Sequence, residues 1–600
     1  MVDQYIDGKE LFESDVNSGY QFTLENNPNN IVIESGNEST GIITVLSAQS
    51  VAGLYDSLKI VATNPTTLDI KEKEFSIAIN GDPLTEYAWH IENTGQKGFM
   101  LVGGNTGFDI NLPAVFEDGI TGKGVNVAIS DSGIEPNHDD LAPNQLTGEH
   151  RDYSLSPPYL GYPTPTSAHG TAVTGILSAV GWNNMGSIGV APGSNFAGFQ
   201  FLESSQATAL LIHQASGNFD IFNYSYGDAI FSDTASDPDY IDHLKYQSIT
   251  EDKIYVKAAG NEFLMGVGST CASHNANFPF ENESPFIIVV GAINADGVKA
   301  TYSNQGSNLW VTAPGGEGSI KGFEPRIIST DLPNCFKGYS KAVSGLENEF
   351  ESGENALNQE CNYTSVMNGT SSAAPVVAGV IALMREANPN LKQRDIKHIL
   401  ANTAVKIDPD HDLNDFGLLH PSNVLSGCSK MNLSGHDYEL GWVENKAGYS
   451  FNNFYGFGLV DAKAAVDAAK NYTFTLGELV EQNHNFNVSK FSSGTLNVSI
   501  PDNSSTGVSD VITVSSDDAL TIESVQVKLR AAHAQSGELG VELTSPQGTK
   551  SILMNINNSF LLLDKDDDGT IDGDSNLNIV LTSHAFYGES SEGDWTIKII

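Results

Sequence analysis

The stretch VNVAISDSGIEPNHDDL, at residues 125–141, decides the fold of this 600-residue chain. Its first residues form a largely apolar run flanked by glycines, which is typical of a strand buried within a parallel sheet. Asp131 follows at the carboxyl end of this run, and open parallel sheets place their active sites at that edge. The stretch therefore predicts an active-site carboxylate at the edge of a mainly parallel sheet.

Two further segments carry side chains that complement this carboxylate. HGTAVTGI (169–176) places His169 at the start of an apolar helical pattern, and NGTSSAAPVVAG (368–379) places Ser371 at the start of another. The macrodipole at a helix N-terminus favours developing negative charge, and the backbone N–H groups there are free to donate. The buried face of the second helix is predicted to comprise Val376, Val377, Val380, Ile381 and Leu383.

Together these side chains predict nucleophilic catalysis. A serine hydroxyl is a poor nucleophile at neutral pH, so it needs a base beside it and a carboxylate behind that base. We expect Ser371 to be the nucleophile, His169 the general base and then acid, and Asp131 the group that orients the imidazole. A further predicted strand, DKIYVKAAGNE (252–262), leads into Asn261, whose amide can donate to the oxyanion alongside the N–H of Ser371. The four residues predict serine-protease chemistry.

The DSG, HGT, AAGN and GTSSAAP segments resemble those of the subtilisin-like serine protease superfamily, and of its kexin-like branch in particular. DPLTEYAWHIENTGQ (82–96) and WVENKAGYSFNNFYGFGLVDAKAAV (442–466) resemble the segments that open and close kexin-like catalytic domains. GELGVELTSPQGTKSIL and GDWTIKI resemble parts of the kexin P-domain. The resemblance implies a secreted, calcium-dependent serine endopeptidase acting on protein or peptide substrates.

A second hypothesis, from a different class, is a non-catalytic adhesion or scaffold protein that retained the protease fold. The presence of all four catalytic residue types favours the enzyme, because a decayed protease is expected to lose at least one of them.

Three units are predicted along the chain. Residues 1–81 alternate apolar and polar positions between turn-rich spacers, which predicts an all-β, cadherin-like module. The alternative is an inhibitory propeptide, which kexin-like enzymes carry upstream. Residues 82–470 predict an α/β catalytic domain, a mainly parallel sheet with helices on both faces. Residues 476–600 predict a β-sandwich-like P-domain, which we expect to be truncated at its C-terminus.

The resemblance implies a calcium site early in the catalytic domain. Its ligands would be the side chains of Asp82, Asp140 and Asn183, with the main-chain carbonyls of Val180, Met185 and Ser187. Hard oxygen ligands of this kind suit calcium. The alternative is an ordinary asparagine-rich loop.

A second calcium candidate, DKDDDGTIDGD (564–574), is independent of any family. It places carboxylates or a carbonyl at positions 1, 3, 5, 7 and 9 of a calcium loop. Position 12 is Ser575 in place of glutamate, so the bidentate ligand is missing, and the alternative is a solvated acidic turn. The predicted ligands are Asp564, Asp566, Asp568, the Thr570 carbonyl and Asp572.

The substrate-binding edge follows another predicted strand. The resemblance implies that Ser225, Tyr226 and Gly227 pair with the substrate backbone by strand addition.

The residues that would select a basic substrate depart from the kexin-like pattern. Ser132 stands where these enzymes have a second acidic residue, and Asn304 stands where they have an acidic residue after a Tyr-Ser pair. Asp228 and Asp233 follow the substrate-binding edge in altered spacing, and Glu262 offers a carboxylate beside Asn261. A preference for lysine or arginine is therefore a hypothesis.

Composition and charge narrow the partners. The net charge of −44 argues against nucleic acid or anionic membranes, and no apolar run is long enough to span a bilayer. The first residues, MVDQYIDGKE, are polar and are not a signal peptide, so we expect the sequence to begin inside a longer precursor. We expect a secreted monomer, with a chaperone or propeptide assisting maturation.

Four cysteines can form two disulfides in a secreted enzyme, in three possible pairings. Cys335 and Cys361 flank one polar insertion, which favours a bridge between them and leaves Cys271 with Cys428.

Overall fold

The structure is a computed structural model, and most of the chain is described in it. The described residues are 4–7, 21–25, 33–37, 42–45, 53–79, 81–153, 159–160, 165–202, 217–227, 238–267, 270–317, 324–342, 348–409, 435–474, 476–480, 491–562 and 576–600.

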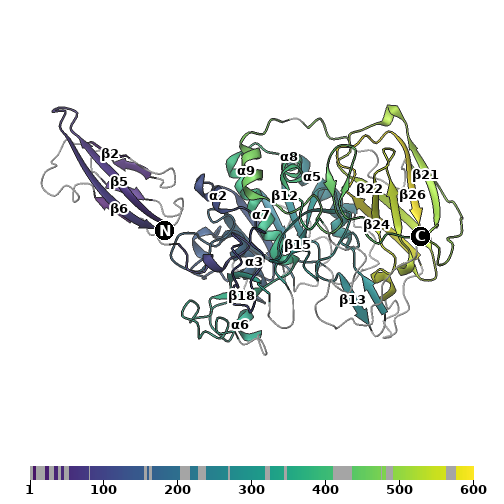
Figure 1. Cartoon of the computed structure of the whole chain (residues 1–600), viewed down its shortest axis with the longest axis horizontal. Coiled ribbons are helices and arrows are strands. Elements are labelled where there is room, and N and C mark those ends of the chain that lie inside the picture. Colours follow the sequence, from purple (N-terminus) through teal and green to yellow (C-terminus); the bar gives the residue numbers. More distant parts are fainter. Residues whose placement is uncertain are drawn as a thin grey trace.

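An eight-stranded sheet lies at the centre of the molecule, in the order β16-β15-β12-β11-β7-β10-β8-β9 (Figure 1). All neighbouring pairs are parallel except β8 and β9, which are antiparallel at one edge. The strands are β7 (Asn126–Asp131), β8 (Arg151–Asp152), β9 (Tyr159–Leu160), β10 (Asn195–Gln200), β11 (Ile221–Tyr224), β12 (Ile254–Ala258), β15 (Ile287–Ile293) and β16 (Leu309–Pro314).

Helices cover both faces of this sheet, because successive strand residues point to opposite sides and both sides are apolar. In β7, Val127 and Ile129 belong to the cluster formed with α3, α7, α8 and α9. Ala128 belongs to the opposite cluster, together with Tyr240 and Leu244 of α5. The helices are α2 (Pro113–Glu117), α3 (His169–Ser178), α5 (Pro238–Thr250), α6 (Gly338–Ala342), α7 (Thr370–Ala387), α8 (Gln393–Thr403) and α9 (Ala462–Lys470). The predicted fold class is confirmed.

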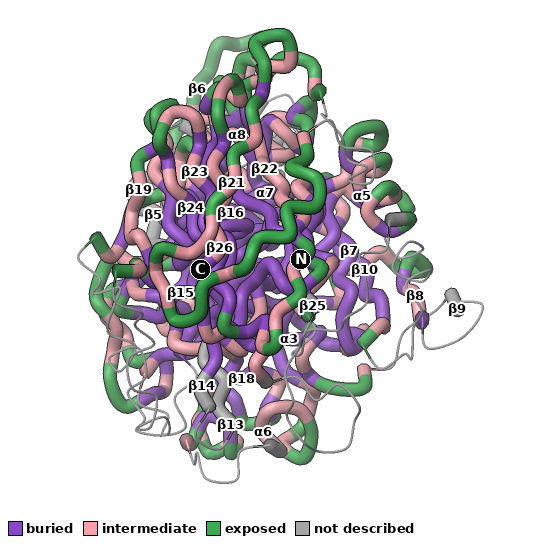
Figure 2. The backbone as a smooth tube through the Cα atoms, turned by 90° about the vertical axis from the view of Figure 1, so that its right-hand side faces the viewer, coloured by how far each residue is buried: buried purple, intermediate pink, exposed green. Residues whose placement is uncertain are grey.

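Helix α7 is the longest of these helices. It contacts α3, α9 and four strands of the sheet. Every residue from Thr370 to Met384 is buried, and the five residues predicted as its apolar face are fully inaccessible. In Figure 2, α7 lies in the buried, purple centre of the molecule.

Smaller elements connect and flank the sheet. They are three antiparallel strand pairs: β13 (Leu264–Val267) with β14 (Thr270–Ser273), β17 (Ile327–Thr330) with β18 (Tyr363–Met367), and β19 (Val443–Glu444) with β20 (Ser450–Phe451). Short 3₁₀ helices occupy Thr85–Tyr87, Ala142–Asn144, Phe280–Glu283, Ser516–Asp518, Ser536–Glu538 and Ser559–Leu562. Helix α6 lies in the polar insertion that Cys335 and Cys361 flank.

The C-terminal part is built from antiparallel strands in two sheets, β21-β26-β23-β24 and β22-β25. It packs against the part of the chain that contains the central sheet: Ser307 Oγ donates to the Thr582 carbonyl at 2.7 Å, and the Arg394 guanidinium of α8 pairs with Glu523. The strands are β21 (Val508–Val514), β22 (Val525–Ala532), β23 (Val541–Thr544), β24 (Lys550–Met554), β25 (Asn576–Ser583) and β26 (Gly593–Ile599).

The N-terminal part contains two three-stranded antiparallel sheets, β1-β4-β3 and β2-β5-β6. In Figure 1, β2, β5 and β6 project from one end of the molecule. The strands are β1 (Gln4–Asp7), β2 (Gln21–Glu25), β3 (Ile33–Asn37), β4 (Ile42–Val45), β5 (Gly53–Thr63) and β6 (Ile70–Ile79). The choice between a cadherin-like module and a propeptide stays a prediction.

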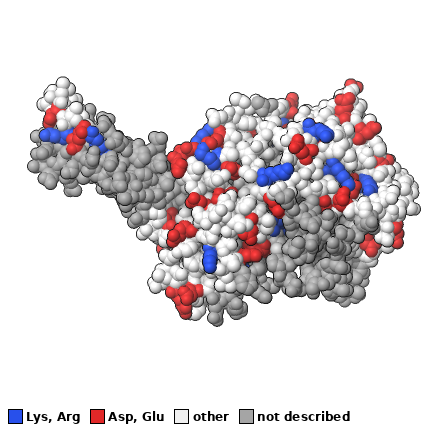
Figure 3. Space-filling view, viewed as in Figure 1, with Lys and Arg blue, Asp and Glu red and all other residues white. Residues whose placement is uncertain are grey.

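The surface carries the acidic excess of the sequence, with basic side chains interspersed among acidic ones on the face seen in Figure 3. Among the described helices, none has the length and apolar character needed to cross a membrane.

Candidate active site

Asp131 and His169 are in direct contact. Asp131 is the last residue of β7 and is fully buried, and His169 is the first residue of α3. The imidazole Nδ1 lies 2.8 Å from Oδ1 and 2.9 Å from Oδ2 of Asp131. The backbone N–H of Ser132 also donates to Asp131 Oδ1, at 2.7 Å. The carboxylate is thus fixed by its own strand end and faces the imidazole.

A glycine permits this close approach of helix to strand. A Cβ atom at Gly170 would lie 2.2 Å from the Gly133 carbonyl oxygen and 3.1 Å from Asp131 Cβ. The N–H of Gly170 donates to Ser132 Oγ at 3.1 Å. The glycine after His169 is therefore required by space, and Ser132 ties the helix start to the strand end.

The Asp131 contact sets the protonation behaviour of His169. Burial opposes the charged imidazolium, but the negative charge and hydrogen bond of Asp131 outweigh it and raise the pKa of His169 above its ordinary value. A carboxylate on Nδ1 also fixes the proton there, which leaves Nε2 as the acceptor in the neutral ring. The ring is thereby prepared to take a proton at Nε2.

Ser371 lies in the first turn of α7, where backbone N–H groups have no intrahelical partner. Pro375, four residues on, has no N–H, so the Ser371 carbonyl is also left without its helical donor. Ser225 Oγ supplies that donor at 2.9 Å, and Ser371 Oγ in turn donates to the Ser225 carbonyl at 3.0 Å. Two reciprocal hydrogen bonds therefore join the helix start to the residue after β11.

Asn261 follows the end of β12 and is oriented by the residue before Ser371. Its Oδ1 accepts from the Thr370 N–H at 2.8 Å and from Thr370 Oγ1 at 2.9 Å. Because a backbone N–H can only donate, these bonds assign Oδ1 and leave Nδ2 as the donor end of the amide. Asn261 is exposed, so this donor is accessible from solvent.

The four predicted catalytic residues lie at one edge of the sheet. Strands β7, β11 and β12 are neighbours, and Tyr224 at the end of β11 pairs with Ser130 of β7 and Lys257 of β12. Two hydrogen-bonded groups meet at this edge: Asp131 with His169, and Ser371 with Asn261 through Thr370. In this conformation the Ser371 hydroxyl is bonded to Ser225, so proton transfer to the imidazole requires a rotation of that hydroxyl.

The predicted substrate-binding residues Ser225, Tyr226 and Gly227 directly follow β11, and Gly227 is exposed. A buried lysine, Lys257, contacts Tyr226 of this segment. Lys257 Nζ donates to the Tyr226 carbonyl at 2.6 Å and lies 4.3 Å from the centre of the Tyr226 ring. The lysine itself pairs with Glu281 at 3.3 Å. Its role in fixing this segment has no signal in the sequence, because nothing there predicts its buried position.

Three side chains implied as calcium ligands come together near the end of α3. Asp82 accepts the backbone N–H groups of Trp182, Asn183 and Asn184 at 2.6 Å, 2.8 Å and 3.0 Å. The amide Nδ2 of Asn183 donates to Asp140 Oδ1 at 2.7 Å. Both carboxylates are buried, and in the described part of the chain no lysine, arginine or histidine forms an ion pair with either.

The electrostatics of this pair fit a cation. Burial raises the pKa of Asp82 to about 6, and burial together with the charge of Asp82 raises the pKa of Asp140 well above its ordinary range. Asp140 Oδ2 lies beside the Tyr363 phenol and makes no hydrogen bond of ordinary geometry. The Val180, Met185 and Ser187 carbonyls accept no backbone N–H within the described ranges. A hard cation would neutralise the two carboxylates and use these free oxygens.

Other predicted site residues lie outside the described residues. They are Asp228, Asp233, and the second calcium candidate with Asp564, Asp566, Asp568, Thr570 and Asp572. Over the described residues, no group of three or more histidine, cysteine, aspartate or glutamate side chains is arranged to hold a metal.

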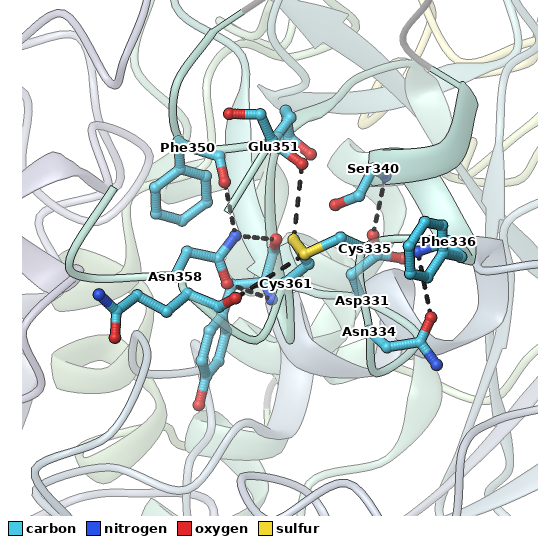
Figure 4. The surroundings of a disulfide bond; sticks show 12 residues. Asp331, Asn334, Cys335, Phe336, Ser340, Phe350, Glu351, Asn358 and Cys361 are labelled. Atoms are coloured by element: carbon cyan, nitrogen blue, oxygen red, sulfur yellow. Dashed lines mark hydrogen bonds between the residues drawn. A yellow bond between two sulfur atoms is a disulfide. The ribbon is translucent and has the colours of Figure 1, made fainter. Parts of the chain in front are cut away.

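A disulfide joins Cys335 and Cys361, with their Cα atoms 5.0 Å apart (Figure 4). Cys428 and the Cys271 side chain lie outside the described residues, so their pairing stays a prediction. Nearby, Asp331 accepts the backbone N–H groups of Leu332, Tyr339 and Ser340, and thereby caps the first turn of α6. The bridge and this cap stabilise one insertion of the catalytic domain.

Sequence reasoning missed the partners that hold Asn261. Thr370 lies in the GTSSAAP segment, where the sequence assigns it no role, and the sequence relates Asn304 and Glu262 only to substrate selection. In the structure, Glu262 Oε2 accepts the Asn261 N–H at 2.8 Å and Asn304 Nδ2 at 3.3 Å. The Glu262 carboxylate is therefore directed toward the backbone of Asn261. The only sequence signal was that Glu262, which can form hydrogen bonds, is next to Asn261. The orientation of its carboxylate depends on tertiary contacts.

Comparison with known proteins agrees with this geometry. Residues 122–458 match the Subtilase family, and residues 522–600 match the Proprotein convertase P-domain. The Aeromonas extracellular serine protease of Aeromonas sobria is 34% identical over 548 residues, which cover 86% of this chain and 84% of the relative. Neuroendocrine convertase 2 of Rattus norvegicus is 28% identical over 543 residues, which cover 88% and 72%.

A solved structure is also similar over most of its length. The complex of the Aeromonas sobria serine protease (ASP) and the chaperone (ORF2) contains a chain that superposes with a TM-score of 0.73 at 31% sequence identity. The match covers 87% of this chain and 89% of that chain.

Proposed function

Because the chain belongs to the subtilase family and is a serine endopeptidase, we propose that it cleaves peptide bonds through Ser371, His169 and Asp131, with Asn261 in the oxyanion hole. The observation that carries this proposal is the contact of the buried Asp131 with His169 Nδ1 at 2.8 Å, together with the hydrogen bonds that hold Ser371, in the first turn of α7, to the residue after the neighbouring strand β11.

The reaction would proceed through an acyl-enzyme. The Ser371 hydroxyl turns from the Ser225 carbonyl to His169 Nε2, which takes its proton as Oγ attacks the substrate carbonyl carbon. The oxyanion of the tetrahedral intermediate accepts from Asn261 Nδ2 and the Ser371 N–H. His169 then protonates the leaving amine, and a water molecule hydrolyses the ester by the same steps. Asp131 orients the ring through its bond to Nδ1 and stabilises the imidazolium when it forms.

We propose that the segment Ser225–Gly227 pairs with the substrate backbone as an added strand. Its position after β11 and the exposure of Gly227 support this role. We also propose a preference for lysine or arginine in the substrate, which the match of the C-terminal part to a convertase P-domain supports. Profiling of peptide libraries tests it: cleavage after phenylalanine or leucine as efficient as after arginine would refute the preference.

We propose calcium as the cation for the Asp82, Asp140 and Asn183 site, with the carbonyls of Val180, Met185 and Ser187. Bound there, calcium would supply positive charge that holds the loop after α3 against the start of the catalytic domain, which is a stabilising role. The loop at 564–574 is proposed as a second calcium site on its sequence pattern alone.

We also propose that the enzyme is secreted and that a chaperone assists its maturation. The first proposal is supported by the relative named an extracellular protease, and the second by the relative solved with a chaperone. Both would be tested by expressing the chain with and without a candidate chaperone and measuring activity in the culture medium.

A fluorophosphonate serine probe tests the central proposal. We expect the full chain to be labelled and Ser371→Ala to be unlabelled, with the same melting temperature. A parallel chain lacking residues 1–81 tests whether that part blocks the site. No labelling of either wild-type form would contradict the enzyme mechanism and favour the scaffold hypothesis.

A further inference from the structure

A short segment between β15 and β16, Tyr302 to Asn304, lies behind the oxyanion site and is bonded to both sides of it. Ser303 and Asn304 are fully buried, and Ser303 Oγ accepts the N–H of Ala292 in β15 at 3.0 Å. The segment is thus anchored to the central sheet, and its other two residues reach outward from that anchor.

Asn304 bonds to three of the residues that surround Asn261. Its N–H donates to the Gly260 carbonyl at 3.0 Å, and its Nδ2 donates to the Ala259 carbonyl at 3.1 Å. Its Oδ1 accepts the N–H of Glu262 at 2.9 Å. One buried side chain therefore fixes the backbone on both sides of the oxyanion residue.

Glu262 closes this arrangement. Its Oε2 accepts the Asn261 N–H and Asn304 Nδ2, so the carboxylate links the two asparagines directly. The fit is close, because Gly260 has a φ of +103° and a Cβ atom there would lie 2.2 Å from Asn304 Nδ2. The loop that contains Gly260 and Asn261 therefore has no space to move toward Asn304. The hydrogen bonds to Asn304 oppose a movement away from it.

Tyr302 contacts the loop that carries the other predicted oxyanion donor. Its hydroxyl accepts the N–H of Gly369 at 2.9 Å and lies 2.7 Å from the Gly316 carbonyl. Gly369 has a φ of +115° and is two residues before Ser371, whose N–H is the second predicted donor. The Tyr302 carbonyl also accepts the N–H of Phe263 at 3.1 Å. Tyr302 thus joins the loop of Asn261 to the loop of Ser371.

We propose that Tyr302, Asn304 and Glu262 are positioning residues that set the separation of the two oxyanion donors. The inference rests on the proposed function, because it assigns a task to residues around Asn261 and Ser371. Oxyanion donors act at about 2.7–3.1 Å from the developing charge, and a misplacement of about 1 Å costs about 10²-fold in rate. Hydrogen bonds that fix both donor loops to one anchored segment hold them within that tolerance.

The test uses the full chain with Tyr302→Phe and Asn304→Asp. The first removes only the hydroxyl, and the second replaces an amide donor with a carboxylate that repels Glu262. Matched controls are Tyr587→Phe, which removes a hydroxyl bonded to His398, and Asn445→Asp, another buried asparagine bonded to four backbone groups. Both control sites are at the contact with the P-domain, away from the oxyanion loops.

The measurements are kcat, KM, melting temperature and the affinity for a peptide aldehyde, whose adduct with serine carries an oxyanion. We expect kcat to fall by about tenfold or more in Tyr302→Phe and Asn304→Asp, with KM within about twofold, since only transition-state contacts are weakened. Aldehyde affinity should fall in proportion to kcat/KM. The controls should keep the wild-type kcat. If Asn304→Asp does not fold, Tyr302→Phe and Glu262→Gln carry the test.

An unchanged kcat in the folded variants overturns the proposal. So does a rise in KM alone, which would mean that the segment shapes the substrate pocket, and so does an equal loss in the controls, which would mean a general stability effect. Failure of the proposed function is distinguishable, because the wild-type chain would then not react with the fluorophosphonate probe.

Discussion

Replacing Asp131 with asparagine isolates the task of the buried carboxylate. The N–H of Ser132 donates to Asp131 Oδ1 at 2.7 Å, so the amide oxygen of asparagine would take that position. The amide NH₂ would then occupy the Oδ2 position, 2.9 Å from His169 Nδ1. An amide that donates to Nδ1 forces the ring proton onto Nε2. The imidazole is then in the wrong tautomer to accept the proton of Ser371.

The expected loss follows from this tautomer change. The same substitution in a serine-protease triad lowers kcat by about 10⁴, which corresponds to about 5 kcal/mol of barrier. The pH profile should move as well. In the wild type the pKa of His169 is raised, so activity should fall as the pH decreases through a value above about 6.5. With the charge removed, burial alone remains and lowers the pKa, so the acid limb should move below about 6.5.

The free energy of unfolding should depend on pH in the opposite direction to the activity. A raised pKa in the folded state means that the Asp131–His169 pair stabilises the fold fully below about pH 6.5, and that this stabilisation is lost as the pH rises through the folded pKa of His169. The variant should lack this pH-dependent contribution, as measured by denaturant unfolding at several pH values. Peptide hydrolysis at saturating substrate gives kcat.

Asp220→Asn is the matched control. Asp220 accepts the N–H of Asn126 at 2.9 Å, at the opposite end of the same strand β7. It should keep wild-type kcat and the wild-type acid limb. The reasoning is refuted if Asp131→Asn keeps more than about a tenth of the activity, or if its acid limb stays in place.

Three further changes have defined outcomes. Chelation of calcium should lower the melting temperature, because a ligand at a hundredfold excess over its Kd stabilises the folded state by about 2.7 kcal/mol. The drop should be smaller in Asp140→Asn. An equal melting temperature with and without chelator would remove the calcium proposal. Joint replacement of Cys335 and Cys361 by alanine opens a loop of 26 residues. It should lower the free energy of unfolding by about 3 kcal/mol in denaturant titrations. No change would show that the bridge places little constraint on the unfolded chain. Arg394→Met should remove the ion pair with Glu523 and lower the melting temperature at low salt by the equivalent of about 1 kcal/mol. The loss should be smaller at high salt, because salt screens the ion pair. A loss that does not depend on salt would indicate that packing, and not charge, is responsible.

The strand and the helices that carry Asp131, His169 and Ser371 could be predicted because each is specified by the local sequence. The apolar run before Asp131 specifies a buried strand, and the small residues after Ser371 specify a helix that can pack closely in the core. A strand end or a helix start then fixes where the polar side chain lies. The contact of Cys335 with Cys361 was predictable for a similar reason, since both flank one insertion.

The support of the site could not be predicted, because it depends on residues that meet only in the folded chain. Asn304 lies 43 positions from Asn261, and its burial beside Gly260 reflects the sheet order. Glu262 was considered for substrate selection, and its orientation toward the Asn261 N–H is set by that same contact. The Ser225 carbonyl, which holds the Ser371 hydroxyl, gives no sequence signal because backbone atoms are common to all residues.

The burial of α7 has a consequence for how the enzyme loses activity. Amide hydrogens of an element enclosed on all sides exchange with solvent only when the whole domain opens, so α7 should be among the slowest-exchanging segments. Ser371 is therefore carried on a helix whose buried body opens only together with the domain. Thermal inactivation should then follow the rate of global unfolding, and the working lifetime of the enzyme becomes a kinetic property of its entire catalytic domain.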